Sequence, residues 1–256
     1  MTSLRALWRL LACTAHVLRG ALTCALVFPF LAPKARMRRV GTWSAQMLQL
    51  MGIALEPQGT PHPGPLLVVA NHISWLDILA INAVRPVRFV SKADVRHWPL
   101  IGYLVASGGT LFIERERKRD AMRVVHQMAQ ALRAGDVVAV FPEGTTGDGR
   151  GLLPFHANLL QAAIATATPV QPVALRFADA ASPVSAAVEF LGETTLVASI
   201  WRVARAQGLR VRVQLLATEA TAHLDRRALS ERLRGEIHAA LAAMPGGAAA
   251  GSECAP

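Results

Sequence analysis

Short apolar runs recur along the chain and are separated by stretches with helical spacing. The runs that predict strands are Leu66–Ala70, Arg88–Ser91, Thr110–Ile113, Val137–Phe141, Val170–Phe177, Val188–Leu191 and Leu209–Leu216. The last is the clearest, because apolar residues alternate there with arginine and glutamine at the period of a half-buried strand. Helices are predicted between the runs, at Arg119–Ala134, Phe155–Ala167, Thr195–Gln207 and Asp225–Ala243. Strands that alternate with helices indicate an α/β layer fold.

The first 55 residues have a different pattern. Residues 1–39 hold seven basic residues and no acidic one, and their longest charge-free stretch, Gly20–Pro33, is shorter than the roughly 20 residues that span a bilayer. An amphipathic segment, Ala35–Ile53, follows. We expect two basic, apolar helices that form a hairpin in the membrane interface. A pair of core helices and a single transmembrane anchor are the alternatives.

Four prolines and two glycines mark Leu55–Pro65 as a linker and the expected domain boundary. The expected catalytic domain then covers residues 66–244. Residues 245–256 are a Gly/Ala tail that we expect to be disordered.

Composition and missing motifs exclude several classes of function. The net charge of +10 favours an anionic partner, such as a membrane surface, nucleic acid or a phosphorylated substrate. Nucleic acid is disfavoured because the basic residues lack interleaved aromatics and no recognition motif is present. The three cysteines, Cys13, Cys24 and Cys254, have no metal-site spacing, and no Walker A, G-x-G-x-x-G, G-x-S-x-G or H-E-x-x-H motif occurs.

Polar clusters follow three of the predicted strands directly: Asn71-His72, Glu114-Arg115 and Pro142-Glu143-Gly144-Thr145. Ligands of open α/β sheets bind beyond the carboxyl ends of strands, so these loops are expected to converge on one pocket. His72 is the candidate general base, held by Asp77 five residues later. The two side chains meet only if His72 lies on the loop and Asp77 in the first turn of the next helix, with Ser74 as its N-cap. Asp77 as a helix cap alone is the simpler alternative.

The other clusters suggest anion binding. The Arg115 guanidinium matches phosphate oxygens bidentately, although its neighbours are typical of a solvated helix start. Gly144 permits close approach of a ligand, and Thr145 offers a hydroxyl. Glu143 would bond a substrate hydroxyl or pair with Arg115, and Lys92 is a second candidate cation or an ordinary surface lysine.

Together these motifs resemble the PlsC-like family of 1-acylglycerol-3-phosphate acyltransferases. Its four motifs are matched in order by Asn71-His72-x4-Asp77, Gly109-x-x-Phe112-Ile113-x-Arg115, Phe141-Pro142-Glu143-Gly144-Thr145 and Pro169-Val170-x-Pro172-Val173. The resemblance implies a mixed sheet flanked by helices, preceded by membrane-associating N-terminal helices. It implies acyl transfer from acyl-CoA or acyl carrier protein to a lysophospholipid, giving phosphatidic acid, without a metal or other cofactor.

The resemblance also assigns roles. It implies His72 as base, Asp77 as its partner, and Arg115 with Glu143–Thr145 at the acceptor phosphate. Further candidate binding residues are Phe112 and Pro172, from the second and fourth motifs, and Lys92, from its place after a predicted strand. Because acyl-CoA and acyl carrier protein are cytosolic, the site is expected on the cytoplasmic face of a bacterial inner membrane.

Two departures from the family pattern concern the acceptor. Phe155-His156-Ala157-Asn158 replaces a Phe-Lys-x-Gly pattern, and Glu114 stands where Asp or Asn is common. A lyso-ornithine lipid is therefore an alternative acceptor. The alternative from another class is a non-catalytic membrane-binding protein, which would leave the pairing of His72 with Asp77 without a purpose.

Overall fold

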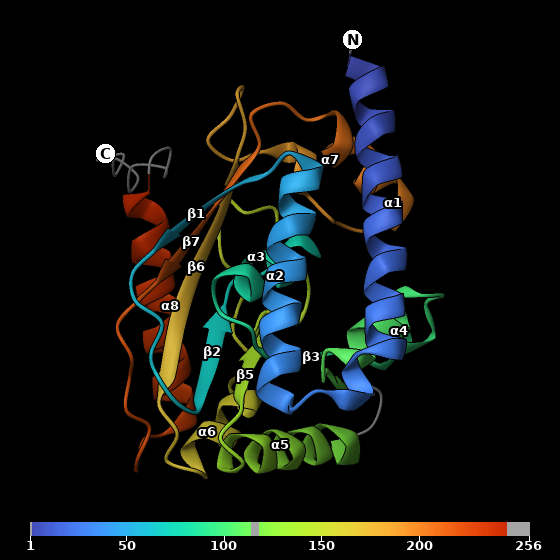
Figure 1. Ribbon diagram of the computed structural model, residues 1–256. Coiled ribbons are helices and arrows are strands. Elements are labelled where there is room, and N and C mark those ends of the chain that lie inside the picture. Colours follow the sequence, from blue (N-terminus) through green and yellow to red (C-terminus); the bar gives the residue numbers. More distant parts are fainter. Residues whose placement is uncertain (1, 114–117, 245–256) are drawn as a thin grey trace, which may run out of the picture.

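The computed structural model describes residues 2–113 and 118–244 (Figure 1). These residues contain a seven-stranded sheet with the order β1-β7-β6-β2-β5-β3-β4. The strands are β1 Ala54–Gln58, β2 Leu66–Ala70, β3 Arg88–Lys92, β4 Leu111–Ile113, β5 Val137–Val140, β6 Val170–Ala178 and β7 Arg210–Leu215. Neighbouring strands are parallel except β6 and β7, which are antiparallel. The sheet is therefore mixed, as expected.

Helices cover both faces of the sheet (Figure 1). The α-helices are α1 Thr2–Leu26, α2 Pro33–Met51, α3 Leu76–Val84, α4 Ile101–Ser107, α5 Lys118–Arg133, α6 Gln161–Ile164, α7 Leu196–Arg205 and α8 Arg226–Ala243. Short 3₁₀ turns are η1 Phe28–Phe30, η2 Ala93–His97, η3 Ala157–Leu160 and η4 Ala186–Val188. Helices α2, α3 and α7 pack on one face, and α5, α6 and α8 pack on the other.

Strand β2 lies at the centre of this three-layer arrangement. All five of its residues are buried, and Leu67 and Val69 face one core while Leu66, Val68 and Ala70 face the other. A strand buried on both faces has a continuous apolar sequence, which explains why this run lacks alternation. The loop that follows it carries His72.

Three sequence predictions of secondary structure are wrong. Val188–Leu191 is no strand, because Ser185 accepts a hydrogen bond from the Ala187 N–H and begins the η4 turn there. Phe155–Ala167 divides into η3 and α6 rather than forming one helix. The expected linker at 55–65 begins as β1, which pairs with β7 at the edge of the sheet. Pro57 is tolerated there because an edge strand does not need every N–H for its ladder.

The N-terminal helices α1 and α2 are antiparallel (Figure 1) and are joined by side-chain contacts. The His16 ring stacks on Trp43 with a centroid distance of 5.0 Å, and its Nε2 donates to the Trp43 carbonyl at 3.0 Å. Trp43 Nε1 donates in return to the His16 carbonyl at 3.2 Å. Arg9 Nη1 donates to the carbonyls of Ala204 and Ala206 at the end of α7, both at 2.9 Å, and this fixes α1 on the domain.

Helix α2 belongs to the core of the sheet. Met47, Leu48 and Met51 are buried in the same cluster as residues of α3 and β2. The boundary expected at 55–65 therefore falls between parts of the chain that pack on one core. No helix among residues 2–113 and 118–244 combines the length and apolarity needed to cross a membrane.

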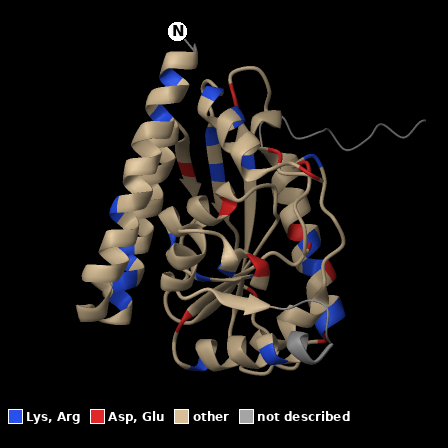
Figure 2. Cartoon of the chain, turned by 90° about the vertical axis from the view of Figure 1, so that its right-hand side faces the viewer, with Lys and Arg blue, Asp and Glu red and all other residues tan. Residues whose placement is uncertain are grey.

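Helix α1 has an exposed apolar face, which we call the α1 stripe. Its members are Leu4, Leu7, Trp8, Leu11, Leu18, Leu22 and Leu26, each more than half exposed. This spacing places them within about a third of the helix circumference. The opposite side, with Ala6, His16 and Gly20, is buried against the domain. Figure 2 shows Lys and Arg along α1 and α2, with no acidic residue on either helix.

Candidate active site

The loop after β2 is tied to the neighbouring strand β6. Asn71 Oδ1 accepts from the Leu175 N–H at 2.8 Å, and Asn71 Nδ2 donates to the Leu175 carbonyl at 3.0 Å. The amide thus replaces one ladder pair at the point where β2 ends. This bracing fixes the start of the segment that carries His72.

His72 and Asp77 are in direct contact. His72 Nδ1 lies 2.8 Å from Asp77 Oδ2, and the same oxygen accepts from the backbone N–H groups of Ile73 at 2.6 Å and Ser74 at 2.9 Å. Asp77 is fully buried in the first turn of α3, where the helix dipole also favours a negative charge. The predicted meeting of loop and first helical turn is therefore present.

Ser74 does not cap α3 with its side chain, contrary to the prediction. Its hydroxyl is buried and has no hydrogen-bond partner among the described residues. Asp77 reaches back to the Ser74 N–H instead, which is the second half of a capping box. The one carboxylate thus orders the loop and holds the histidine.

The His72 ring is also held across its face. It stacks on Phe141 with a centroid distance of 4.0 Å and an interplanar angle of 8°, and Phe141 stacks in turn on Phe89. The His72 side chain is 19% exposed, and Nε2 hydrogen-bonds to none of the described residues. When Nδ1 donates to Asp77, Nε2 carries the lone pair that can take a proton.

Glu143 holds the backbone of this loop. Its Oε1 accepts from the His72 N–H at 2.7 Å, and its Oε2 accepts from the Leu153 N–H at 2.8 Å. Gly147 N–H donates to the His72 carbonyl at 2.7 Å, so both backbone groups of His72 are bound by one loop. Glu143 is 5% exposed, and burial raises the pKa of its carboxyl above the ordinary value. Among the residues that the structure describes, its partners are thus backbone groups, which were not expected from the sequence.

The remaining predicted residues lie at varying distances from this centre. Gly144, with φ +73°, follows Glu143 in a turn closed by its N–H on the Phe141 carbonyl, and Thr145 is exposed beside it. Lys92 ends β3 and is exposed, and Phe112 lies on the paired strand β4. Pro172 is buried at the third position of β6, opposite Val69, the next-to-last residue of β2. Arg115 lies outside the described residues.

Two features of the site were missed. Phe141 supports the His72 ring, and the signal was its place at the end of a strand beside the Pro142-Glu143-Gly144 turn. The contacts of Leu153 and Gly147 had no signal, because they depend on how the loop folds back. Among the described residues, no three His, Cys, Asp or Glu side chains are grouped as a metal site would require.

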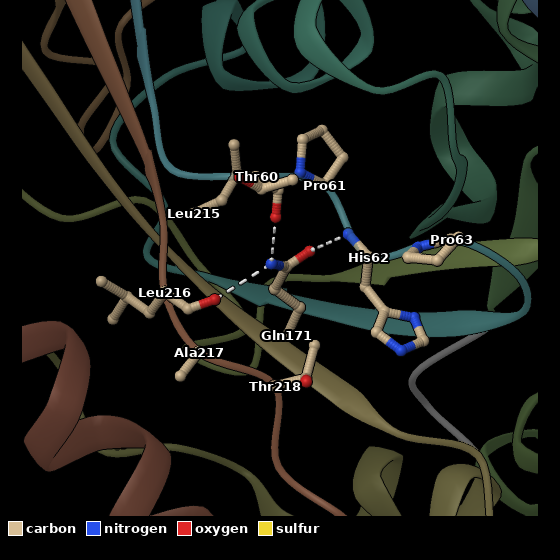
Figure 3. Close-up of a pocket in the computed structure, with 9 residues that line it drawn as sticks. All are labelled: Thr60, Pro61, His62, Pro63, Gln171, Leu215, Leu216, Ala217 and Thr218. Carbon is tan, nitrogen blue, oxygen red and sulfur yellow. Dashed lines mark hydrogen bonds between the residues drawn. The ribbon is translucent and has the colours of Figure 1, made fainter.

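The hollow in Figure 3 is a separate feature at the amino ends of β2 and β6. Gln171 crosses it, donating to the carbonyls of Thr60 and Leu216 at 3.0 Å and accepting from the His62 N–H at 3.2 Å. These bonds join the segment before β2 to the end of β7. His72 lies at the opposite end of β2, so this hollow is not part of the candidate site.

Comparison with known proteins agrees with this arrangement. Residues 55–176 match the family model described as Acyltransferase. The chain is 36% identical over 214 residues to the 1-acyl-sn-glycerol-3-phosphate acyltransferase of Neisseria gonorrhoeae, covering 82% of this chain and 83% of the relative. It is 35% identical over 206 residues to the lyso-ornithine lipid O-acyltransferase of Pseudomonas aeruginosa, covering 80% and 79%.

A solved structure supports the fold. The crystal structure of the 1-acyl-sn-glycerophosphate acyltransferase PlsC from Thermotoga maritima matches with a TM-score of 0.72 over 95% of this chain and 97% of that one, at 16% identity. The sequence relatives cover most of both chains at more than a third identity. The chain therefore belongs to the acyltransferase family that includes the PlsC-like 1-acyl-sn-glycerol-3-phosphate acyltransferases.

Proposed function

We propose that this enzyme transfers a fatty acyl group from an acyl thioester to the free hydroxyl of 1-acyl-sn-glycerol 3-phosphate, giving phosphatidic acid. The observation that carries the mechanism is the contact of His72 Nδ1 with Asp77 Oδ2, which leaves Nε2 as the proton-accepting edge. Nε2 takes the hydroxyl proton while the oxygen attacks the thioester carbonyl. Collapse of the tetrahedral intermediate expels the thiolate, which receives the proton from the imidazolium.

The residues around His72 assist these reaction steps through their charge and their fixed positions. Asp77 stabilises the imidazolium, and the two backbone N–H groups on Asp77 Oδ2 hold the carboxylate in place. The thioester is already activated, so no covalent enzyme intermediate is needed. Either acyl-CoA or acyl carrier protein would supply that thioester.

The acceptor has two candidates. The Neisseria relative is named for 1-acyl-sn-glycerol 3-phosphate, and the Pseudomonas relative is named for lyso-ornithine lipid. The identities to these two relatives, 36% and 35%, are too similar to favour one acceptor over the other. His156, in place of a family lysine, favours the second acceptor because it removes a fixed cation. The net charge of +10 favours the phosphate-bearing one.

We also propose that residues 1–55 hold the enzyme on the cytoplasmic face of a bacterial inner membrane. The α1 stripe offers apolar side chains to the acyl region, and the basic residues before Val40 suit anionic headgroups. The acceptor would then reach the site from the leaflet while the thioester arrives from the cytosol.

A substrate panel tests this function. The purified enzyme is assayed with lysophosphatidate and with lyso-ornithine lipid in mixed micelles, each with acyl-CoA and with acyl carrier protein as donor. We expect the higher kcat/KM with lysophosphatidate. A higher value with lyso-ornithine lipid would assign the enzyme to that lipid, and no transfer to either acceptor would refute the proposal.

A further inference from the structure

Exposed apolar side chains gather at a second place besides the α1 stripe, at the start of α4. Trp98, Leu100 and Tyr103 are 39%, 38% and 45% exposed. We call residues 96–103 the α4 corner. Its apolar groups include two aromatic rings that also carry a polar atom, and they lie between β3 and the body of α4.

The α4 corner is held in a fixed shape. Leu100 has φ +62°, a backbone region that costs free energy for a residue with a branched side chain. A Cβ on Gly102 would lie 2.2 Å from the Arg96 carbonyl oxygen, so only glycine allows this close turn. Gly102 N–H donates to the Trp98 carbonyl at 2.8 Å. The backbone of this turn therefore fixes the positions from which Trp98 and Tyr103 are exposed.

Helix α4, which begins within the α4 corner, lies beside the second half of α1. Helix α4 packs on α1, and the Cys24 side chain hydrogen-bonds with that of Ser107 at the end of α4. Figure 1 shows α4 beside the second half of α1. The stripe residues there, Leu22 and Leu26, are 60% and 66% exposed. Cys24 lies on the side of α1 away from the α1 stripe, so α4 and the stripe occupy different sides of this half of the helix.

The charges around the α4 corner suit an anionic surface. Of the described residues from 92 to 97, Lys92, Arg96 and His97 are exposed basic side chains, and Asp94 is the one exposed acid. Tryptophan and tyrosine are the residues that settle at the boundary of headgroups and acyl chains, because each has an apolar body and a polar tip. A surface for a second copy of the chain would have less need of this basic rim.

We propose that the α4 corner is a second membrane contact, which inserts Trp98 and Tyr103 at the headgroup level of an anionic bilayer. This inference rests on the membrane association proposed above. Arg96 lies over the Phe112 ring at 5.8 Å from its centroid, so the corner is coupled directly to β4. The contact would set the height of the β3–β4 side of the candidate site above the leaflet.

Fluorophore labelling tests this placement. In a background with Cys13→Ala, Cys24→Ser and Cys254→Ser, which must keep acyl transfer in micelles, single cysteines are introduced as Tyr103→Cys, Leu11→Cys and His238→Cys. Each is labelled with nitrobenzoxadiazole and mixed with vesicles of phosphatidylglycerol and phosphatidylethanolamine. We expect a blue shift and an intensity rise at 103 and at 11, and neither at 238 on α8.

The outcomes separate the two proposals. A shift at 11 without one at 103 would overturn the α4 corner contact and leave the anchoring by α1 intact. No shift at either position would overturn both. A shift at 103 that depends on protein concentration, without vesicles, would assign the corner to self-association instead.

A matched pair of variants adds a second readout. Trp98→Ala with Tyr103→Ala should weaken vesicle partitioning about tenfold, because two half-buried aromatic side chains lose their apolar contacts with lipid. Met122→Ala on α5 removes an apolar side chain that is 75% exposed elsewhere, and partitioning should not change. Equal partitioning of the aromatic variant and the wild type would refute the contact. Activity in micelles should be preserved in both variants.

Discussion

The Asp77 carboxylate acts on several groups at once. Its Oδ2 accepts hydrogen bonds from His72 Nδ1 and from two backbone N–H groups. Its Oδ1 is buried and has no hydrogen-bond partner among the described residues. All of these donors favour a charged acceptor. A neutral amide would accept at one atom only and would place its own N–H groups near the same donors.

Asp77→Asn should therefore damage turnover far more than substrate binding. We expect kcat to fall by about 10²–10⁴, the usual contribution of general base catalysis, with KM for the acceptor changed little. Steady-state kinetics in micelles measure both constants. Asp94→Asn, which changes an exposed carboxylate on η2, is the control and should behave as wild type. A wild-type kcat in the Asp77 variant would remove the carboxylate from the mechanism.

Glu143 lends itself to a pH measurement. Burial raises the pKa of its carboxyl, so the folded protein keeps this proton where an unfolded chain, with a glutamate pKa of about 4.3, has lost it. The stability that this proton contributes is present below about 4.3 and is lost as the pH rises through the folded-state pKa.

The variant Glu143→Gln does not titrate at this position. The free energy of unfolding of wild type relative to the variant should therefore fall with rising pH over that interval and become level above it. Denaturant unfolding from about pH 4 to about pH 8 measures this. A difference that increases with pH would mean that the two backbone donors outweigh burial.

Among the elements, α2 differs most from what its sequence suggested. It was expected to belong to a membrane hairpin, yet Leu48 is 1% exposed and packs in the core of the sheet. Leu48→Ala should cost about 2–5 kcal/mol of unfolding free energy, as buried leucine truncations do. Leu18→Ala on the α1 stripe should change it by less than about 0.5 kcal/mol.

Denaturant titration in micelles compares the two leucine variants. Similar small losses for both would show that α2 is detachable from the domain. We do not expect this, because Met47 and Met51 are buried beside Leu48 on the same face of the helix.

Sequence patterns predicted the elements that are long or regular. The strands β2, β5, β6 and β7 and the helices α5, α7 and α8 were found because their burial follows a period or a continuous apolar run. Strand β1 was missed because Pro57 and the following prolines are typical of a linker, and only pairing with β7 makes it a strand. Helix α4 was missed because it is short and begins at the irregular Leu100.

The same limit applies to the candidate site. His72 and Asp77 could be paired from their spacing and from the helix start between them. The hydrogen-bond partners of Glu143 could not be predicted, because the loop from Phe141 to Leu153 has no regular period. Its path is set by tertiary contacts, such as the hydrogen bond from the Gly147 N–H to the His72 carbonyl. Pro172, assigned from a motif, is buried in β6 opposite Val69 near the end of β2, and its role at the site stays a prediction.

In the membrane association proposed above, two attractions would act on the whole molecule. The basic residues before Val40 contribute about 1 kcal/mol each near an anionic leaflet, a contribution that salt screens. Burial of the α1 stripe does not depend on salt in this way. High salt alone should therefore leave most of the protein on anionic vesicles, while detergent should release it.

Vesicle flotation at low and high salt measures this balance. Full release by salt would show that electrostatic attraction alone holds the protein and that the α1 stripe stays outside the bilayer. Replacing Leu11 and Leu18 by glutamate should make binding weak at every salt concentration, because a charged side chain opposes burial in the acyl region.

The central claim is that His72 is the general base. The direct test is kcat for acyl transfer to lysophosphatidate by purified His72→Ala, with its circular dichroism and unfolding midpoint compared with wild type. We predict a kcat lower by about 10²–10⁴ in a protein that is still folded. A folded His72→Ala enzyme with near wild-type kcat would contradict the mechanism.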